Sequence, residues 1–238
     1  MKILFRYLFV LLLAVAVFSC DKKDNYDPPS STLTGHQLYQ GDTIYVERNA
    51  VHFQIYQYGF GRVGPISTDE TFAQDGSYSA LLFPGDYKLI IPTGDGPFMW
   101  KQTAAGTPDS LAVTVNAAQT TADFEVTPYY MIRNAQISAA GASNVTASCS
   151  LEKIVTDANA KDIEYVALYV NSTQFVSGVN NVVSTSVAGA DISSDNTVQL
   201  SATVPALTPT QNYVFARIGV KMVNVEDLIF SPLVKITF

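Results

Sequence analysis

Short runs in which apolar and polar residues alternate recur along the chain, with turn-forming residues between them. Examples are residues 51–56, 111–115 and 122–126, and pairs such as Asp75-Gly76 and Pro84-Gly85 lie in the intervals. A period of two is typical of half-buried strands, and no window keeps a helical apolar period over three turns. The sequence therefore predicts an all-β protein built from β-sandwiches.

The composition supports folding and argues against one class of partner. Of the 238 residues, 47% are hydrophobic and only 15% are charged, so the chain has enough apolar surface to bury. The formal net charge is −7, and Lys and Arg do not cluster beyond residue 23. The chain therefore lacks the basic surface that nucleic acid requires, and no nucleic-acid partner is expected.

The N-terminus has the pattern of an export signal. Lys2 and Arg6 precede an apolar run over residues 7–18, which is too short to span a bilayer as a helix. The run ends in Val-Phe-Ser-Cys at residues 17–20, which resembles the lipobox of bacterial lipoproteins. That resemblance implies a signal peptide over residues 1–19 and lipid attachment at Cys20, in preference to a buried or disulfide-bonded cysteine.

Residues 20–31 are charged and then rich in Pro and Ser, with almost nothing to bury, so they are expected to form a tether. The mixed Lys and Asp behind Cys20 resemble a signal by which Gram-negative gut commensals move lipoproteins outward. The resemblance implies a lipid-anchored protein of the outer membrane, facing the cell exterior.

Only one other cysteine is present, so a disulfide framework is not expected once Cys20 is acylated. Cys149 lies in a run with apolar or small odd positions and polar even positions. We expect a buried, inert thiol on a strand, in preference to a nucleophile.

The first predicted domain covers residues 32–127. Asp75-Gly76 is expected to close a hairpin, Tyr78 to face the core, and Pro84-Gly85 to turn the chain into a strand carrying Tyr87. The segment resembles the carboxypeptidase regulatory-like, or transthyretin-like, β-sandwich. In that family the module is a non-catalytic companion.

The second predicted domain covers residues 128–238. The segment from Leu207 to Ile218 resembles the corner of fibronectin type III domains, where a Tyr hydroxyl ties a strand to its loop, with Tyr213 in that role. Gln211 replaces the Thr of the family pattern. An immunoglobulin-like or fibronectin-like sandwich is expected, with strands over residues 131–137, 145–151, 163–170, 198–204, 213–218 and 233–238.

Taken together, the tether, the join sequence at residues 123–130 and the two sandwiches resemble a family of uncharacterised two-domain surface lipoproteins. Members tend to be encoded beside starch-utilisation-type outer-membrane importers. Because of this gene neighbourhood, the resemblance implies glycans and glycan-importer proteins as partners.

Sites for catalysis are poorly supported. The glycines at positions 59, 61 and 64 have dinucleotide-binding spacing, but Pro65 follows where a helix should begin, so no cofactor is expected. His36 and His52 have no metal-ligand spacing, and no metal is expected. Paired carboxylates such as Glu226 and Asp227 lie in predicted loops without a rigid cleft, so a hydrolase is the third choice.

Aromatic residues in the loop at residues 94–101 are the first-choice ligand contacts. Phe98 and Trp100 follow flexible glycines, and aromatic rings can stack on sugar rings. The alternative is that Trp100 plugs the end of the first sandwich or the interdomain seam. Tyr129 and Tyr130 at the join are expected to pack between the domains.

Two short motifs suggest modification. Asp42-Thr43-Ile44 and Asp109-Ser110-Leu111 resemble the acceptor used for O-glycosylation of exported proteins in gut commensals, which implies glycans on Thr43 and Ser110. We expect a non-catalytic surface lipoprotein that binds glycans or assists a polysaccharide uptake system. The alternative is a structural or adhesive protein that contacts other surface proteins.

Overall fold

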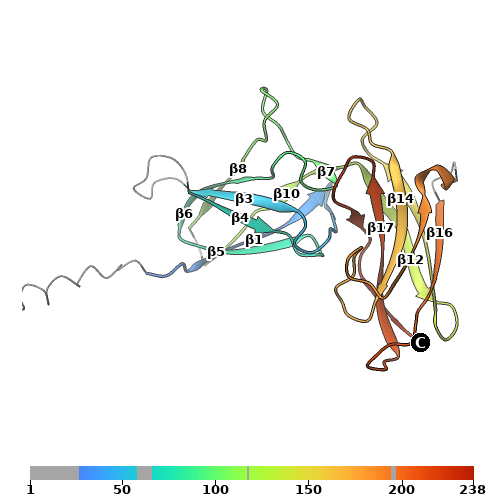
Figure 1. Ribbon diagram of the computed structural model, residues 1–238. Helices are drawn as coiled ribbons and strands as arrows, with labels where there is room; N and C mark the ends of the chain where they lie inside the picture. Colours follow the sequence, from blue (N-terminus) through green and yellow to red (C-terminus); the bar gives the residue numbers. More distant parts are fainter. Residues whose placement is uncertain (1–26, 58–65, 117, 194–196) are drawn as a thin grey trace, which may run out of the picture.

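The computed structural model describes residues 27–57, 66–116, 118–193 and 197–238. In this part of the chain the regular elements are β-strands apart from one short 3-10 helix, η2 (Gly189–Asp191), so the all-β prediction is confirmed. Two sandwiches lie one after the other along the molecule (Figure 1). Within the described ranges no helix is long and apolar enough to cross a membrane. The expected signal peptide, Cys20 and the glycine-rich loop at 59–64 lie outside them.

The first sandwich consists of two sheets and a small ribbon. In one sheet β1 (Ser31–Tyr39) pairs with β2 (Asp42–Thr43), β5 (Ser77–Leu82), β9 (Gln119–Thr121) and β10 (Phe124–Glu125). The other sheet has the order β4 (Ile66–Thr71), β3 (His52–Gln57), β6 (Gly85–Ile90) and β8 (Leu111–Val115). The ribbon pairs β7 (Phe98–Met99) with β11 (Thr127–Pro128) at the end that meets the second sandwich.

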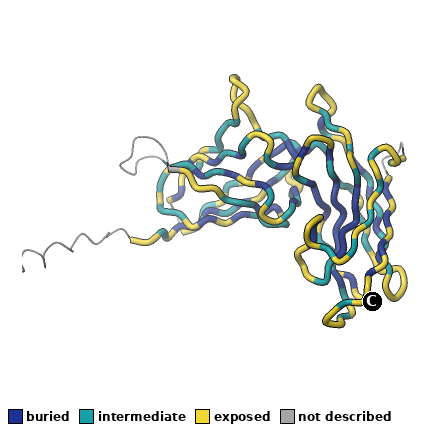
Figure 2. Tube along the Cα trace, in the orientation of Figure 1, coloured by how far each residue is buried: buried dark blue, intermediate teal, exposed yellow. Residues whose placement is uncertain are grey.

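Aromatic residues fill the interior of the first sandwich. Figure 2 shows buried residues along the strands and exposed residues in the loops that project from them. Phe53, Phe72, Tyr78 and Phe124 pack with ring centroids 4.7–5.8 Å apart, mostly edge to face. The Tyr78 hydroxyl donates a hydrogen bond to the carbonyl oxygen of Ala122 at 2.6 Å. Tyr78 therefore faces the core, as the sequence predicted.

The turn at Asp75-Gly76 does not close a hairpin, and that prediction is wrong. It carries the chain from β4, which pairs with β3, to β5, which pairs with β1 in the opposite sheet. Gly76 has φ +75°, and a Cβ there would lie 2.2 Å from the carbonyl oxygen of Ile44. The glycine is therefore required by its positive φ and by the close approach of the Ile44 carbonyl, which follows β2 in the same sheet as β5.

The second sandwich also has two sheets. One has the order β12 (Tyr130–Ala139), β13 (Asn144–Lys153) and β16 (Thr197–Thr203). The other has the order β15 (Val183–Ala188), β14 (Ile163–Asn171) and β17 (Tyr213–Met222), with β18 (Ile229–Phe230) and β19 (Val234–Thr237) both paired to β17. The predicted immunoglobulin-like or fibronectin-like sandwich is confirmed.

The corner before β17 differs from the predicted one. Val214 is fully buried, so Tyr213 lies on the outer face of the strand, where its ring contacts Phe215 and the Lys235 ammonium 4.1 Å from the ring centroid. The tie between strand and loop comes from Gln211. Its Nε2 donates hydrogen bonds of 2.8 Å to the carbonyl oxygens of Ser172 and Tyr213.

Cys149 lies on β13, where buried and partly exposed residues alternate as predicted. Its side chain is 3% exposed, and burial raises the pKa of the thiol to about 11. The thiolate is therefore scarce at neutral pH, which agrees with the predicted inert role.

The two sandwiches share an apolar seam. Tyr45, after β2, forms an isolated antiparallel bridge to Phe230 of β18. Ile44 and Val46, on either side of Tyr45, are fully buried and belong to a core cluster that continues into the second sandwich. Packing therefore joins the two predicted domains.

Candidate functional site

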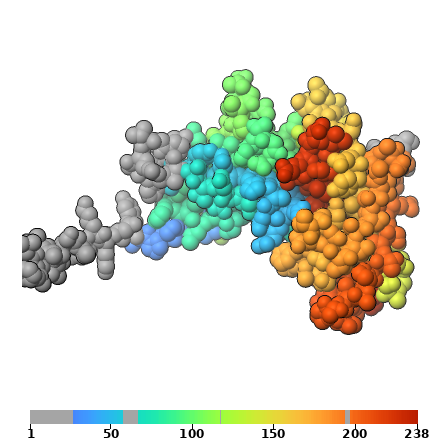
Figure 3. Space-filling model, in the orientation of Figure 1, coloured from blue at the N-terminus to red at the C-terminus, as the bar shows by residue number. Residues whose placement is uncertain are grey.

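A cleft of about 330 Å³ opens where the two sandwiches meet. One wall comes from the loops around β7, within residues 91–108, and the other from residues 158–161 and 224–225. Figure 3 shows a notch between the green projection of the first sandwich and the yellow projection of the second, which carry these loops. The cleft thus exists only when both sandwiches are in place.

Three aromatic residues line the cleft: Phe98, Trp100 and Tyr129. Trp100 and Tyr129 are partly exposed, while Phe98 is only 4% exposed. A Cβ at Gly96 would lie 2.3 Å from the Phe98 ring, so this ring packs directly beneath the backbone. Two aromatic surfaces, one from each side of the domain join, are therefore accessible in the cleft.

Trp100 has a structural role as well. Its Nε1 donates a hydrogen bond of 2.7 Å to the carbonyl oxygen of Asp109, and its ring lies 5.4 Å from that of Phe124 in the core. The Lys101 ammonium lies 5.4 Å from the Trp100 ring centroid. The packing alternative for Trp100 thus describes its inner side, and its remaining surface lines the cleft.

Carboxylates meet at one end of the cleft. Asp95 Oδ1 lies 3.7 Å from His52 Nδ1, and Asp227 accepts a hydrogen bond of 2.9 Å from the backbone N–H of Gly96. Burial raises the pKa of both Asp95 and Asp227, and repulsion from Glu226 raises them further. The second sandwich thereby holds the Gly96 loop through a partly desolvated carboxylate.

The remaining lining offers uncharged polar groups and one ammonium. Gln102 contributes from the first sandwich, and Asn159, Lys161 and Asn224 from the second. The Lys161 ammonium lies 5.9 Å from the Tyr129 ring centroid. Hydrogen-bonding groups thus surround two aromatic surfaces, which is the usual composition of a site for a polar ligand.

Sequence reasoning missed most of the second wall. Tyr129 was expected only to pack between the domains, and Asn159 and Lys161 were not singled out. Asn159 and Lys161 lie in the connection between β13 and β14, which has no sequence motif of its own. Their position opposite Trp100 therefore depends on the domain arrangement.

The proposed glycan acceptors are not among the residues that line the cleft. Thr43 is partly exposed in β2, and Asp42 before it pairs with Arg133 of the second sandwich. Ser110 is partly exposed beside Asp109. Modification at either residue remains a prediction.

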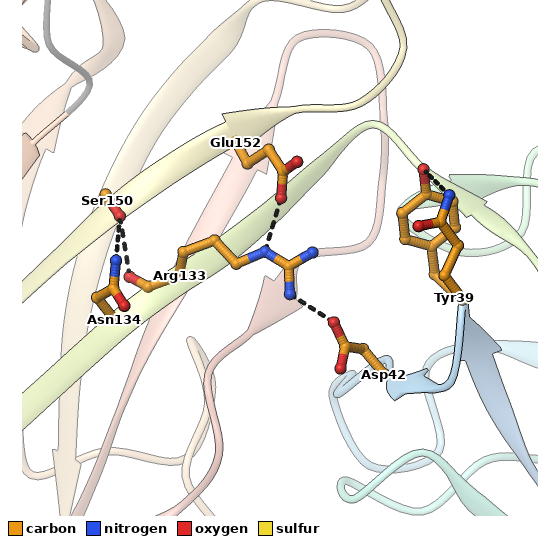
Figure 4. A network of polar contacts seen from close by, with 7 residues as sticks. Tyr39, Asp42, Arg133, Asn134, Ser150 and Glu152 are labelled. Carbon is orange, nitrogen blue, oxygen red and sulfur yellow. Dashed lines mark hydrogen bonds and ion pairs between the residues drawn. The ribbon is translucent and has the colours of Figure 1, made fainter.

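Arg133 links the sandwiches at the surface (Figure 4). Its Nη1 lies 2.5 Å from Asp42 Oδ2, and its Nε lies 2.6 Å from Glu152 Oε2. All three side chains are at least 36% exposed, so this network fixes orientation more than it adds stability. Across the described ranges, no group of three His, Cys, Asp or Glu could hold a metal ion.

Two family models match the chain. Residues 31–127 match the N-terminal domain of a protein of unknown function, DUF3823, and residues 130–235 match a domain of unknown function, DUF3823_C. No curated protein matches the chain.

Solved structures of similar proteins cover nearly the whole folded part. A DUF3823 family protein from Parabacteroides merdae is 34% identical with a TM-score of 0.74, over 89% of this chain and 100% of the other. One from Bacteroides ovatus is 28% identical with a TM-score of 0.72, over 88% and 99%.

A third solved structure, from Bacteroides uniformis, is described as a candidate carbohydrate-binding protein. It is 18% identical with a TM-score of 0.67, over 88% of this chain and 100% of the other, so it supports the fold alone. The resemblance to a two-domain family is confirmed at this level: the chain belongs to the DUF3823 family.

Proposed function

We propose that the protein is a non-catalytic surface lipoprotein that binds a glycan in the cleft between its two sandwiches. The observation that carries the proposal is the placement of Trp100 and Tyr129 in one cleft, with polar side chains around them. Aromatic surface and hydrogen-bonding groups together suit a sugar, which has apolar ring faces and polar edges. The description of the Bacteroides uniformis relative points in the same direction.

The proposed location is the outer membrane, with a lipid on Cys20 and the sandwiches facing the cell exterior. The apolar run followed by Val-Phe-Ser-Cys supports the lipid anchor. A tether before β1 would hold the cleft away from the bilayer, where it could pass a glycan to an importer protein. No cofactor enters this function.

The test is a glycan array on the protein purified from residue 21 onward, followed by calorimetry with any glycan that binds. Asn159→Ala and Lys161→Ala remove side chains from the cleft wall, and Asn212→Ala removes an exposed amide outside it. We expect weaker binding in the first two variants and unchanged binding in the third. A protein that binds no glycan but captures another surface protein would favour the adhesive alternative.

A further inference from the structure

The outer face of the three-stranded sheet β12-β13-β16 carries a shallow groove of about 430 Å³. It is separate from the interdomain cleft and lies wholly on the second sandwich. Its polar lining consists of amides and hydroxyls: Gln136, Ser138, Thr146, Ser148, Gln199 and Ser201.

The strand register places these six residues in two rows across the sheet. Gln136 lies opposite Ser148, which lies opposite Gln199. In the next row on this face Ser138, Thr146 and Ser201 are aligned in the same way. In the first row, long amides on the outer strands flank the Ser148 hydroxyl, which gives the groove two walls and a floor there, while the second row carries three hydroxyls.

The six side chains are available to a ligand. Within the described residues none of them makes a hydrogen bond, although neighbours on the same face do. The Thr203 hydroxyl donates to Asn144 Oδ1 at 2.7 Å, and Asn134 Nδ2 donates to the Ser150 hydroxyl at 3.2 Å. Each hydroxyl and amide can both donate and accept, so the groove matches a ligand that does the same.

Charge defines the ligand further. None of the six residues is charged, and the charged residues of β12 and β13, Arg133, Glu152 and Lys153, lie at the ends next to the domain join. An ionic ligand would lose hydration here without meeting an opposite charge. Among the described residues the lining also has no aromatic side chain, so recognition would depend on hydrogen bonds.

The two rows are separated along the strands by two residues, which is a distance of roughly 6.6–6.8 Å. A repeating occupant lying along β13 can therefore present hydroxyls to both rows. We propose that this groove binds one chain of an uncharged polysaccharide, as a second surface that does not depend on the interdomain cleft.

The test is affinity electrophoresis of the purified protein in native gels containing dextran, soluble starch or galactomannan, with polygalacturonate as an acidic comparison. Ser148→Lys places a long cation on the floor of the groove, and Gln199→Ala removes one wall. Ser186→Lys is the matched control, because Ser186 is an exposed serine on β15 in the other sheet. Mobility in gels without polysaccharide corrects for the added charge.

We expect at least one neutral polymer to retard the protein, at least tenfold weaker binding in Ser148→Lys, weaker binding in Gln199→Ala and no change in Ser186→Lys. If Ser148→Lys fails to fold by circular dichroism, Gln199→Ala decides. The proposal is overturned if no neutral polymer binds, if polygalacturonate binds best, or if the groove variants bind normally. Loss of binding only in Trp100→Ala would assign the glycan to the cleft instead. A dimer that Ser148→Lys dissociates would make a second copy the occupant.

Discussion

The guanidinium of Arg217 donates a hydrogen bond from Nη1 to the carbonyl oxygen of Val46, at 2.9 Å, across the seam between the two sandwiches. Arg217 is 1% exposed, and its Nε donates to the carbonyl oxygen of Val176. Its Cζ lies 3.7 Å from the Phe230 ring centroid. Burial lowers the pKa of Arg217 to about 10, so the side chain stays charged at neutral pH without an ion pair among the described residues.

Replacing Arg217 should strongly destabilise the protein. Arg217→Met leaves the buried carbonyls of Val46 and Val176 without these donors, and we expect a loss of about 3 kcal/mol or more in the free energy of unfolding. Urea denaturation measures it. Arg48→Ala, an exposed arginine 5.0 Å from the Phe175 ring, is the control and should change stability by under about 1 kcal/mol. Equal effects in the two variants would contradict the role given to Arg217.

The surface network around Arg133 should matter much less. Asp42→Asn removes one ion pair between partly exposed groups, so the expected loss is about 0.5–1 kcal/mol at low salt. In 1 M salt the difference from the wild type should nearly vanish, because exposed charges are screened. A large loss that salt does not reduce would show that the network is effectively buried.

Asp227→Asn should stabilise the protein at neutral pH. Burial raises the pKa of Asp227, so the folded state binds its proton more tightly than the unfolded state does. Stability contributed by this group therefore falls as pH rises from the ordinary Asp value of 3.8 through the raised pKa. Asn can still accept the hydrogen bond from the Gly96 N–H. The stability gained by Asp227→Asn should therefore appear above this pH range and fade below it. Thermal unfolding from pH 3 to pH 8 tests the trend.

Trp100→Ala should weaken glycan binding in the cleft by about 1–3 kcal/mol, the size of a lost stacking contact. Because the inner side of the ring packs against Phe124, we also expect a moderate loss of folding stability with the fold retained. Calorimetry and circular dichroism separate the two effects. Unchanged affinity in a folded variant would remove Trp100 from the site.

Cys20→Ala should leave the precursor with its signal peptide uncut and absent from the outer membrane, because acylation at this cysteine precedes cleavage. Intact-mass measurement and membrane fractionation of the wild type and the variant test this. A wild-type protein without lipid, together with a variant secreted as a cleaved soluble form, would exclude the lipid anchor.

Features that depend on neighbouring residues can be predicted from the sequence alone. The period of two around Cys149 predicts its place on the buried face of a strand, and the predicted run at residues 111–115 is strand β8. The motif around Tyr78 likewise predicts that this residue faces the core. Alternation is a local property of an extended chain, so it can be read without knowing the partner strand.

Strand pairing and the contacts between loops could not be predicted in this way. Asp75-Gly76 has the sequence of a hairpin turn, yet it connects opposite sheets because β5 pairs with β1. Likewise Gln211, and not the Tyr213 hydroxyl, ties the corner, because Val214 and not Tyr213 faces the core. The cleft residues Trp100 and Asn159 come from different sandwiches. Such contacts depend on the packing of distant segments, which local periodicity does not encode.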